Sequence, residues 1–200
     1  KMISVAQKIT NRIRRQGRGW TFTPKDFLDL ASRSNIDTTL HRLATQGVIK
    51  HYSRGLYVYP KLHPKLGALS PSQDAVANAV ARATGDRIWP TGAMAANTLG
   101  LTTQVPARPA YMTTGRSKTI RIHDKLTIQL RKATLPRTLT HYMAYMALQA
   151  LDNLGPRIVD QKMIDKVAKR LTPDDKKDIQ QNLRYIRNPW LVDIARQLTV

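Results

Sequence analysis

The stretch TTLHRLATQGVIKHYSRGLYVYP, residues 38 to 60, carries the strongest fold signal in the sequence. Its first part is amphipathic with helical spacing, and Gly47 stands where a left-handed residue commonly ends a helix. Two short runs rich in β-branched and aromatic residues follow, at 48–52 and 56–59. The three residues between them include a glycine, which is typical of a β-hairpin. The stretch therefore predicts a helix followed directly by a two-stranded hairpin with Arg54 at its tip.

Two helical segments precede this pair. Apolar residues recur at helical spacing within residues 3–15, where Val5, Ile9 and Ile13 form one line. After the glycines of QGRGW a second, short helix is predicted over residues 23–31, with Thr23 as its N-cap. Helix, helix, helix and hairpin is the order of a winged helix-turn-helix, in which the third helix enters the major groove and the hairpin is the wing.

The third helix is predicted to begin with a capping box formed by Ser34 and Asp37. A tight turn at residues 32–33 joins it to the second helix. Its apolar face consists of Ile36, Leu40 and Leu43. We expect this face to pack on the core, and the remaining positions to face solvent or DNA.

The charge of the chain points to a polyanionic partner. There are 33 Lys and Arg residues against 13 acidic residues, all of them aspartate, for a net charge of +20. Residues 1 to 70 alone hold 13 basic and 3 acidic residues. Nucleic acid is the commonest polyanion. A membrane surface fits less well, because the cations do not lie on one long amphipathic helix and no apolar run approaches the length of a membrane span.

The remainder of the sequence predicts a second domain. Residues 60–72 contain three prolines and a glycine and are interpreted as a linker. Three β-like runs at 110–113, 119–122 and 126–130 are interpreted as an antiparallel meander, and helices follow to the end of the chain. The expected fold class is α+β, with a winged helix-turn-helix domain over residues 1–66 and an α+β domain with C-terminal helices over residues 67–200.

Nine residues are candidates for DNA contact. Arginine can bind guanine through two hydrogen bonds and asparagine can bind adenine, so the third helix supplies the base-reading candidates. Cations before that helix, on the second helix and on the hairpin are expected to bind phosphates. The alternative is an ordinary solvated helix face, which the wing and the local charge make less favourable. The candidates are Lys25, Arg33, Ser34, Asn35, Thr38, His41, Arg42, Lys50 and Arg54.

No catalytic, cofactor or metal site is predicted. The chain has no cysteine, which excludes disulfides, thiolate zinc sites and cysteine nucleophiles and suits a reducing cytoplasm. No two of the five histidines are four residues apart, and the pair Asp174-Asp175 is better explained by a helix start than by a metal. The glycine-rich phosphate loops and the G-x-S-x-G nucleophile motif do not occur.

Two stretches resemble the AbiEi family, the antitoxins of type IV toxin–antitoxin systems. They are residues 17–72 and 90–122, and their most specific parts are GLYVYP at 55–60 and NTLGLTTQVP at 97–106. The resemblance implies a bacterial antitoxin whose N-terminal winged helix binds inverted repeats in the promoter of its own operon and represses it. It also places the DNA-reading positions at Arg33, Ser34, Asn35, Thr38, His41, Arg42 and Arg54.

The same resemblance implies that the rest of the chain counteracts a cognate nucleotidyltransferase-like toxin, with or without a stable complex between the two proteins. The chain does not look like the toxin itself, because it has neither a Gly-Ser pair for a triphosphate nor a D-x-D carboxylate pair. Two other functions stay open at this point. One is a nucleic-acid-binding regulator with no toxin partner, and the other is an unrecognised nucleic-acid enzyme.

Overall fold

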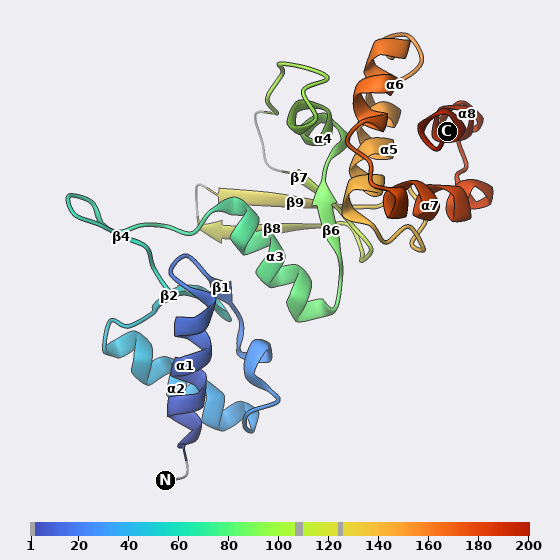
Figure 1. Cartoon of the computed structure of the whole chain (residues 1–200). Helices are drawn as coiled ribbons and strands as arrows, with labels where there is room; N and C mark the ends of the chain where they lie inside the picture. The colour runs from blue at the N-terminus through green and yellow to red at the C-terminus, as the bar shows by residue number, and fades with distance from the viewer. Residues whose placement is uncertain (1–2, 107–109, 124–125) are drawn as a thin grey trace. The chain divides into compact units, whose positions relative to one another are not determined.

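The computed structural model of the chain describes residues 3–106, 110–123 and 126–200. Helices and small sheets alternate along the chain (Figure 1), so the predicted α+β class is confirmed. The chain divides into two compact units. The first contains residues 1–87 and 120–128, and the second contains residues 88–119 and 129–200.

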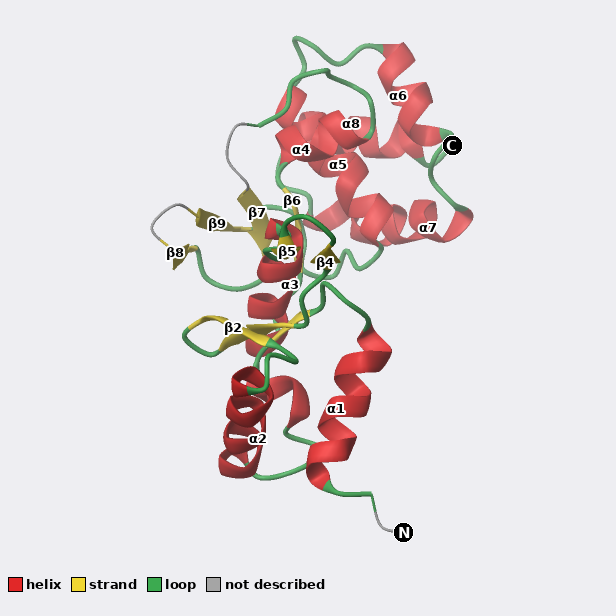
Figure 2. Cartoon of the chain, turned by 90° about the vertical axis from the view of Figure 1, so that its left-hand side faces the viewer, coloured by secondary structure: helices red, strands yellow, loops and turns green. Residues whose placement is uncertain are grey.

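The first unit combines two long helices with a small sheet, and Figure 2 shows α1 and α2 on one side of that sheet. The antiparallel sheet has the order β1-β3-β2, and β4 and β5 form a separate hairpin. The elements of the chain up to residue 84 are α1 (Val5–Gln16), β1 (Thr21–Phe22), the 3-10 helix η1 (Pro24–Phe27), α2 (Arg33–Thr45), β2 (Lys50–Ser53), β3 (Leu56–Val58), β4 (Leu62–His63), β5 (Gly67–Ala68) and α3 (Gln73–Thr84).

The core of the first unit forms where the apolar lines of α1 and α2 meet the aromatic residues of β1 and η1. Phe22 and Phe27 are fully buried and pack edge to face, with ring centroids 5.5 Å apart. The predicted core positions are confirmed, because the buried cluster contains Ile9, Ile13, Ile36, Leu40 and Leu43 together with the two phenylalanines and Ile49. Burying this many large apolar side chains is the main source of stability for a body of this size.

The second predicted helix, over residues 23–31, is wrong in type and length. The segment forms the four-residue 3-10 helix η1 followed by turns. Successive amides bond three residues back, as when Leu28 N donates to Lys25 O and Leu30 N donates to Phe27 O. The predicted cap at Thr23 is present as a capping box with Asp26, so the start is right, but the i→i+3 pattern tightens the turn and does not propagate.

Helix α3 is attached to the first unit by side chains of its last turn. Arg82 lies 3.0 Å from a carboxylate oxygen of Asp26 and donates to the carbonyl oxygen of Thr21 at 2.8 Å. Lys25 Nζ donates to Ala83 O at 2.8 Å. The compact units consequently divide after Arg87, later than the predicted boundary after residue 66.

The predicted linker over residues 60–72 also contains structure. Within it β4 and β5 pair antiparallel, and Leu69 N donates to Lys61 O at 2.8 Å to close the hairpin. Gly67 supplies the positive φ, +68°, that this short turn requires. The prolines that suggested a linker therefore flank and shape a small β-arm.

The remaining elements are helices and a four-stranded sheet with the order β6-β7-β9-β8. Strands β6 and β7 and the end of β9 belong to the second unit, whereas most of β8 and the start of β9 are grouped with the first. Figure 1 shows α5 and α6 in orange and α8 in red at the C-terminal end of the chain. The elements are β6 (Ile88–Pro90), α4 (Gly92–Thr98), β7 (Ala110–Thr113), β8 (Lys118–His123), β9 (Leu126–Lys132), α5 (Tyr142–Leu154), α6 (Gln161–Ala168), α7 (Pro173–Asn182), the 3-10 helix η2 (Leu183–Tyr185) and α8 (Pro189–Leu198).

The predicted meander has the right strands in the wrong order. β7 pairs with β9 and runs parallel to it, with Ala110 opposite Gln129 and Thr113 opposite Lys132, and β8 stands at the edge. All four residues of β7 are buried, whereas β8 carries Lys118 and Arg121. A charged strand is tolerated at an edge, and a strand that is buried along its whole length fits a central position.

Helix α5 is the centre of the second core. Its residues from Ala144 to Leu151 are buried, and Tyr145 stacks on Trp89 with ring centroids 4.0 Å apart. Asp178 of α7 fixes the start of this helix, because its carboxylate accepts from the amides of Thr140 and His141 at 2.8 and 2.7 Å. Among the described residues, no helix of the chain is both long and apolar enough to cross a bilayer.

Helix α4 lies against α5 so closely that position 92 requires glycine. A Cβ atom added at Gly92 would clash with Asn153 Cβ and would lie 2.7 Å from the carbonyl oxygen of Gln149. We predict that Gly92→Ala lowers the free energy of unfolding by about 1–3 kcal/mol, because backbone must move to admit the methyl group. In an uncrowded helix the same change would be neutral or stabilising. Urea denaturation of the two proteins measures the difference, and an unchanged or raised midpoint would contradict the close packing.

Candidate nucleic-acid interface

The N-cap of helix α2 lies two residues earlier than the sequence suggested. Ser32 is the N-cap, and its Oγ accepts from the amide of Asn35 at 3.4 Å. Ser34 lies inside the first turn and does not cap, so the predicted Ser34–Asp37 capping box is wrong. Asp37 instead binds Arg33, the first helical residue, at 2.8 Å. A serine stands at both position 32 and position 34. Only Ser32 has the extended backbone that an N-cap requires, so Ser32 is the residue that caps the helix.

The buried and exposed faces of α2 are sharply separated. Ile36 and Leu40 are fully buried and Leu43 nearly so. The opposite face presents hydroxyl, amide, imidazole and guanidinium groups to solvent. These exposed candidates are Ser34, Asn35, Thr38, His41, Arg42 and, as a further member of the face, Thr45. The structure therefore brings five of the nine predicted residues together on one helix surface.

The end of α2 leads directly into the hairpin. Gly47 adopts a φ of +72°, its amide donates to Ala44 O at 3.0 Å, and Val48 N donates to Leu43 O at 3.0 Å. This closure satisfies the last helical carbonyls and reverses the chain, which confirms the predicted role of Gly47. Because the turn is tight, β2 starts within five residues of the last helical residue.

The hairpin of β2 and β3 presents Arg54 at its turn. Gly55 has a φ of +70°, and Leu56 and Val58 are buried. Lys50 pairs in register with Val58, and a bulge between His51 and Ser53 shifts the ladder near the turn. Lys50 and Arg54 are exposed. Among the residues that the structure describes, the side chains of Arg42, Lys50 and Arg54 have no hydrogen-bonding or ionic partner.

An open hollow of about 440 Å³ lies between α2 and the hairpin. It is lined by His41, Ala44 and Thr45 of the helix and by His51 and Tyr57 of the strands. The rings of His51 and Tyr57 meet edge to face, 5.0 Å between centroids. Burial raises the pKa of the Tyr57 hydroxyl, and the nearby carboxylate of Asp37 raises it further. The hydroxyl thus stays protonated at neutral pH and can donate to a phosphate or base.

Sequence reasoning missed Tyr57 as a member of this surface. Strand alternation places Tyr57 on the face opposite to Leu56 and Val58. That face also carries Phe22, the partner of Tyr57 on β1, and packs on the buried cluster of the first unit. The position of the Tyr57 ring opposite His51 depends on a strand register that only the structure supplies.

Two of the predicted phosphate contacts are engaged within the protein. Lys25 is exposed, but its amine donates to the end of α3 as described above. Arg33 lies beside the α2 face and is paired with Asp37 through two hydrogen bonds, at 2.9 and 2.8 Å. Contact of either residue with DNA stays a prediction and would require these bonds to be exchanged.

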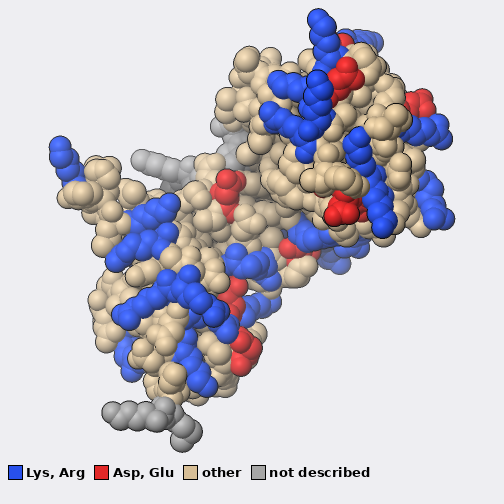
Figure 3. Space-filling model, viewed as in Figure 1, with Lys and Arg blue, Asp and Glu red and all other residues tan. Residues whose placement is uncertain are grey.

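The electrostatic surroundings of α2 and the hairpin favour an anion. Asp37 is the last acidic residue before Asp74, and the interval between them contains Arg42 and four lysines or arginines besides. Figure 3 shows basic side chains spread over the visible surface of the first unit, with fewer acidic ones among them. Within the described parts of the chain, no three His, Cys, Asp or Glu residues are grouped to hold a metal ion.

These features define an α+β protein whose first unit carries an exposed, cationic helix-and-hairpin surface. The chain belongs to DUF6088, a family of unknown function, whose model matches residues 8–179. A comparison of this chain with curated proteins found no match. A crystal structure of the RV2827C protein from Mycobacterium tuberculosis is similar over 100% of this chain and 77% of that chain, at 13% identity and a TM-score of 0.43.

The cap of α2 can be tested by a matched pair of serine substitutions. We predict that Ser32→Ala lowers the free energy of unfolding by about 1 kcal/mol, because the amide of Asn35 loses its acceptor. Ser34→Ala should change stability little, since alanine is well tolerated inside a helix. Thermal or urea unfolding followed by circular dichroism measures both. If both substitutions destabilise the protein equally, or if Ser34→Ala destabilises it more, Ser32 is not the residue that caps α2.

Proposed function

We propose that the chain is a DNA-binding antitoxin that acts in the bacterial cytoplasm. In this proposal the first unit is a winged helix-turn-helix that binds promoter DNA with inverted repeats, with α2 in the major groove and the β2–β3 hairpin as the wing. The protein represses its own operon and counteracts a nucleotidyltransferase-like toxin encoded beside it. It has no catalytic role.

The observation that carries the DNA-binding part is the exposed face of α2 beside the tip of the hairpin. Thr38, His41 and Arg42 offer donors and acceptors that match base edges, and Arg54 offers a cation at the end of a short arm. Side chains that contact bases or phosphates must be exposed, and they are most available when they have no strong partner inside the protein. Arg42 and Arg54 meet both conditions among the described residues.

An ordinary solvated helix face explains these residues less well. Such faces usually carry both signs of charge, because i,i+4 pairs stabilise the helix. Here one such pair, Arg33 with Asp37, occupies the first turns of α2, and no acid follows until Asp74. A surface with so few acids limits repulsion by the phosphate backbone, and its cations gain from the release of counterions from DNA.

The antitoxin part rests on the resemblance of residues 17–72 and 90–122 to the AbiEi family. The second unit would supply the antitoxic activity in this proposal. The neighbouring reading frame discriminates between the functions that the sequence left open. A nucleotidyltransferase-like protein encoded beside this chain supports an antitoxin, and an isolated gene supports a regulator without a toxin partner.

The two unpaired arginines should contribute differently to DNA binding. We predict that Arg42→Ala costs about 1–3 kcal/mol on the operator and relaxes preference at one base pair. Arg54→Ala should weaken operator and scrambled duplex alike and reduce the magnitude of the salt slope by about one. Arg157→Ala, which removes an exposed cation from the second unit, is the control and should leave the operator preference intact. Fluorescence anisotropy at several salt concentrations measures all three.

The assigned roles fail if Arg42→Ala weakens both duplexes equally or if Arg54→Ala leaves the salt slope unchanged. If neither substitution alters binding, α2 is not the reading helix and the winged-helix proposal must be abandoned.

Repression and neutralisation should be separable. We predict that Arg42→Ala loses repression of an operon-promoter reporter but still protects cells that express the neighbouring toxin from an unrelated promoter, because α2 acts only on DNA. Growth and reporter output measured in the same strain test this. Loss of protection by a variant that remains folded and abundant would contradict the proposal that the first unit binds DNA and the second unit counteracts the toxin.

A further inference from the structure

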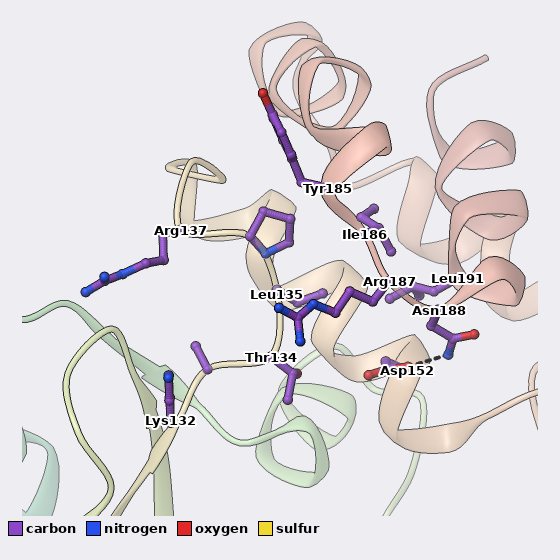
Figure 4. A pocket seen from close by; sticks show the side chains of 12 residues that line it. Lys132, Thr134, Leu135, Arg137, Asp152, Tyr185, Ile186, Arg187, Asn188 and Leu191 are labelled. Atoms are coloured by element: carbon purple, nitrogen blue, oxygen red, sulfur yellow. Dashed lines mark hydrogen bonds between the residues drawn. The ribbon is translucent and has the colours of Figure 1, made fainter.

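The second unit contains a hollow of about 600 Å³ that the DNA-binding proposal does not use. Three segments line it: the chain after β9, one side chain of α5, and the segment from η2 into α8 (Figure 4). A volume of this size is in the range of small-molecule sites. The lining residues are Lys132, Ala133, Thr134, Leu135, Pro136, Arg137, Asp152, Tyr185, Ile186, Arg187, Asn188 and Leu191.

The charge of this lining is positive and largely uncompensated. Asp152 is the one acid among the lining residues, and it already accepts from the side-chain amide of Asn188 at 2.9 Å. Arg137 is engaged outside the hollow, where it donates to Thr114 O at 2.8 Å, and Figure 4 shows it pointing away. Among the described residues, the side chains of Lys132 and Arg187 have no hydrogen-bonding or ionic partner.

Arg187 has the position of a ligand-binding group. Figure 4 shows its side chain crossing the hollow from the segment before α8 toward Thr134 and Leu135. A guanidinium presents a planar fork of donors that fits a phosphate or carboxylate through two hydrogen bonds. The Thr134 hydroxyl offers one more donor on the same side. The Arg187 guanidinium lies over the hollow and its N–H groups have no partner among the described residues, so an anion can bind there without rearrangement of the backbone.

The floor of the hollow is apolar. Leu135, Ile186 and Leu191 belong to the core of the second unit and are nearly fully buried, yet each contributes surface to the hollow. Pro136 adds a flat ring face. A bare inorganic anion would use the cations and leave this floor in water. A ligand with an apolar or aromatic body attached to its anionic group would use both.

We propose that this hollow binds a small phosphorylated molecule with a flat apolar body, of the nucleotide class, whose phosphate is held by Arg187. The body lies on Leu135, Pro136 and Ile186. Phosphate is favoured over carboxylate because it brings up to two negative charges and three acceptor oxygens to a lining that has three cations and one acid. This site is independent of the DNA surface on α2.

The experiment measures binding of the full chain to small ligands by isothermal titration calorimetry at constant ionic strength. The probes are the four common nucleoside monophosphates, the matching nucleosides and inorganic phosphate. We expect at least one monophosphate to bind more tightly than its nucleoside and than inorganic phosphate. Arg187→Gln should weaken that binding at least about tenfold, the usual effect of losing a charge-assisted hydrogen bond.

Arg184→Gln is the matched control. It removes the same charge three residues away, from a side chain that lies over the ring of Tyr185 and does not line the hollow. We expect its affinity to stay within about twofold of the wild type. The proposal is overturned if none of the monophosphates binds at millimolar concentration, if nucleoside or inorganic phosphate alone binds as tightly, or if the two glutamine variants lose affinity equally. Retained duplex binding by Arg187→Gln would confirm that the two sites are separate.

Discussion

The packing of the apolar stripe of α2 against α1 and η1 is the interaction on which the first unit depends. Ile36, Leu40 and Leu43 can enter the core only in one rotation of the helix about its axis. That rotation leaves Thr38, His41 and Arg42 on the outside, so the same hydrophobic contact that stabilises the unit also selects the surface it offers. The glycine turn after α2 then places the hairpin beside that surface.

A second constraint is the use of the few acids. The chain has 13 aspartates and no glutamate, and many of the described ones have specific structural partners. Asp26 and Asp175 complete capping boxes, Asp160 caps α6 and Asp178 binds the amides that start α5. Of these four carboxylates, Asp26 also pairs with a lysine or arginine, Arg82. The chain can therefore keep a net charge of +20 and still satisfy its helix ends, at the expense of mutual repulsion that a polyanionic partner would relieve.

Local signals predicted local structure well and long-range pairing poorly. The periodicity of Ile9, Ile13, Ile36 and Leu40 indicated the core of the first unit, and Gly47 marked the end of α2, because spacing and positive φ are local properties. The parallel pairing of β7 with β9 was not predictable in this way, since it depends on which strands are most apolar once the whole sheet is assembled. Of the candidate site, the exposed face of α2 followed from the core pattern. The sequence could not predict the partners of Lys25 and Arg33, the hollow beside Tyr57 or the cationic lining around Arg187. Each of these features depends on contacts between residues that the sequence separates or leaves ambiguous.

We propose α2 and the β2–β3 hairpin as the surface that meets DNA. The most direct measurement is an NMR titration of the full chain, labelled with ¹⁵N, with a duplex that contains the promoter's inverted repeats. We expect the largest amide shifts on Asn35, Thr38, His41, Arg42 and Arg54, and little change on α6, α7 and α8. Shifts confined to the second unit, or spread evenly over all exposed cations, would contradict it.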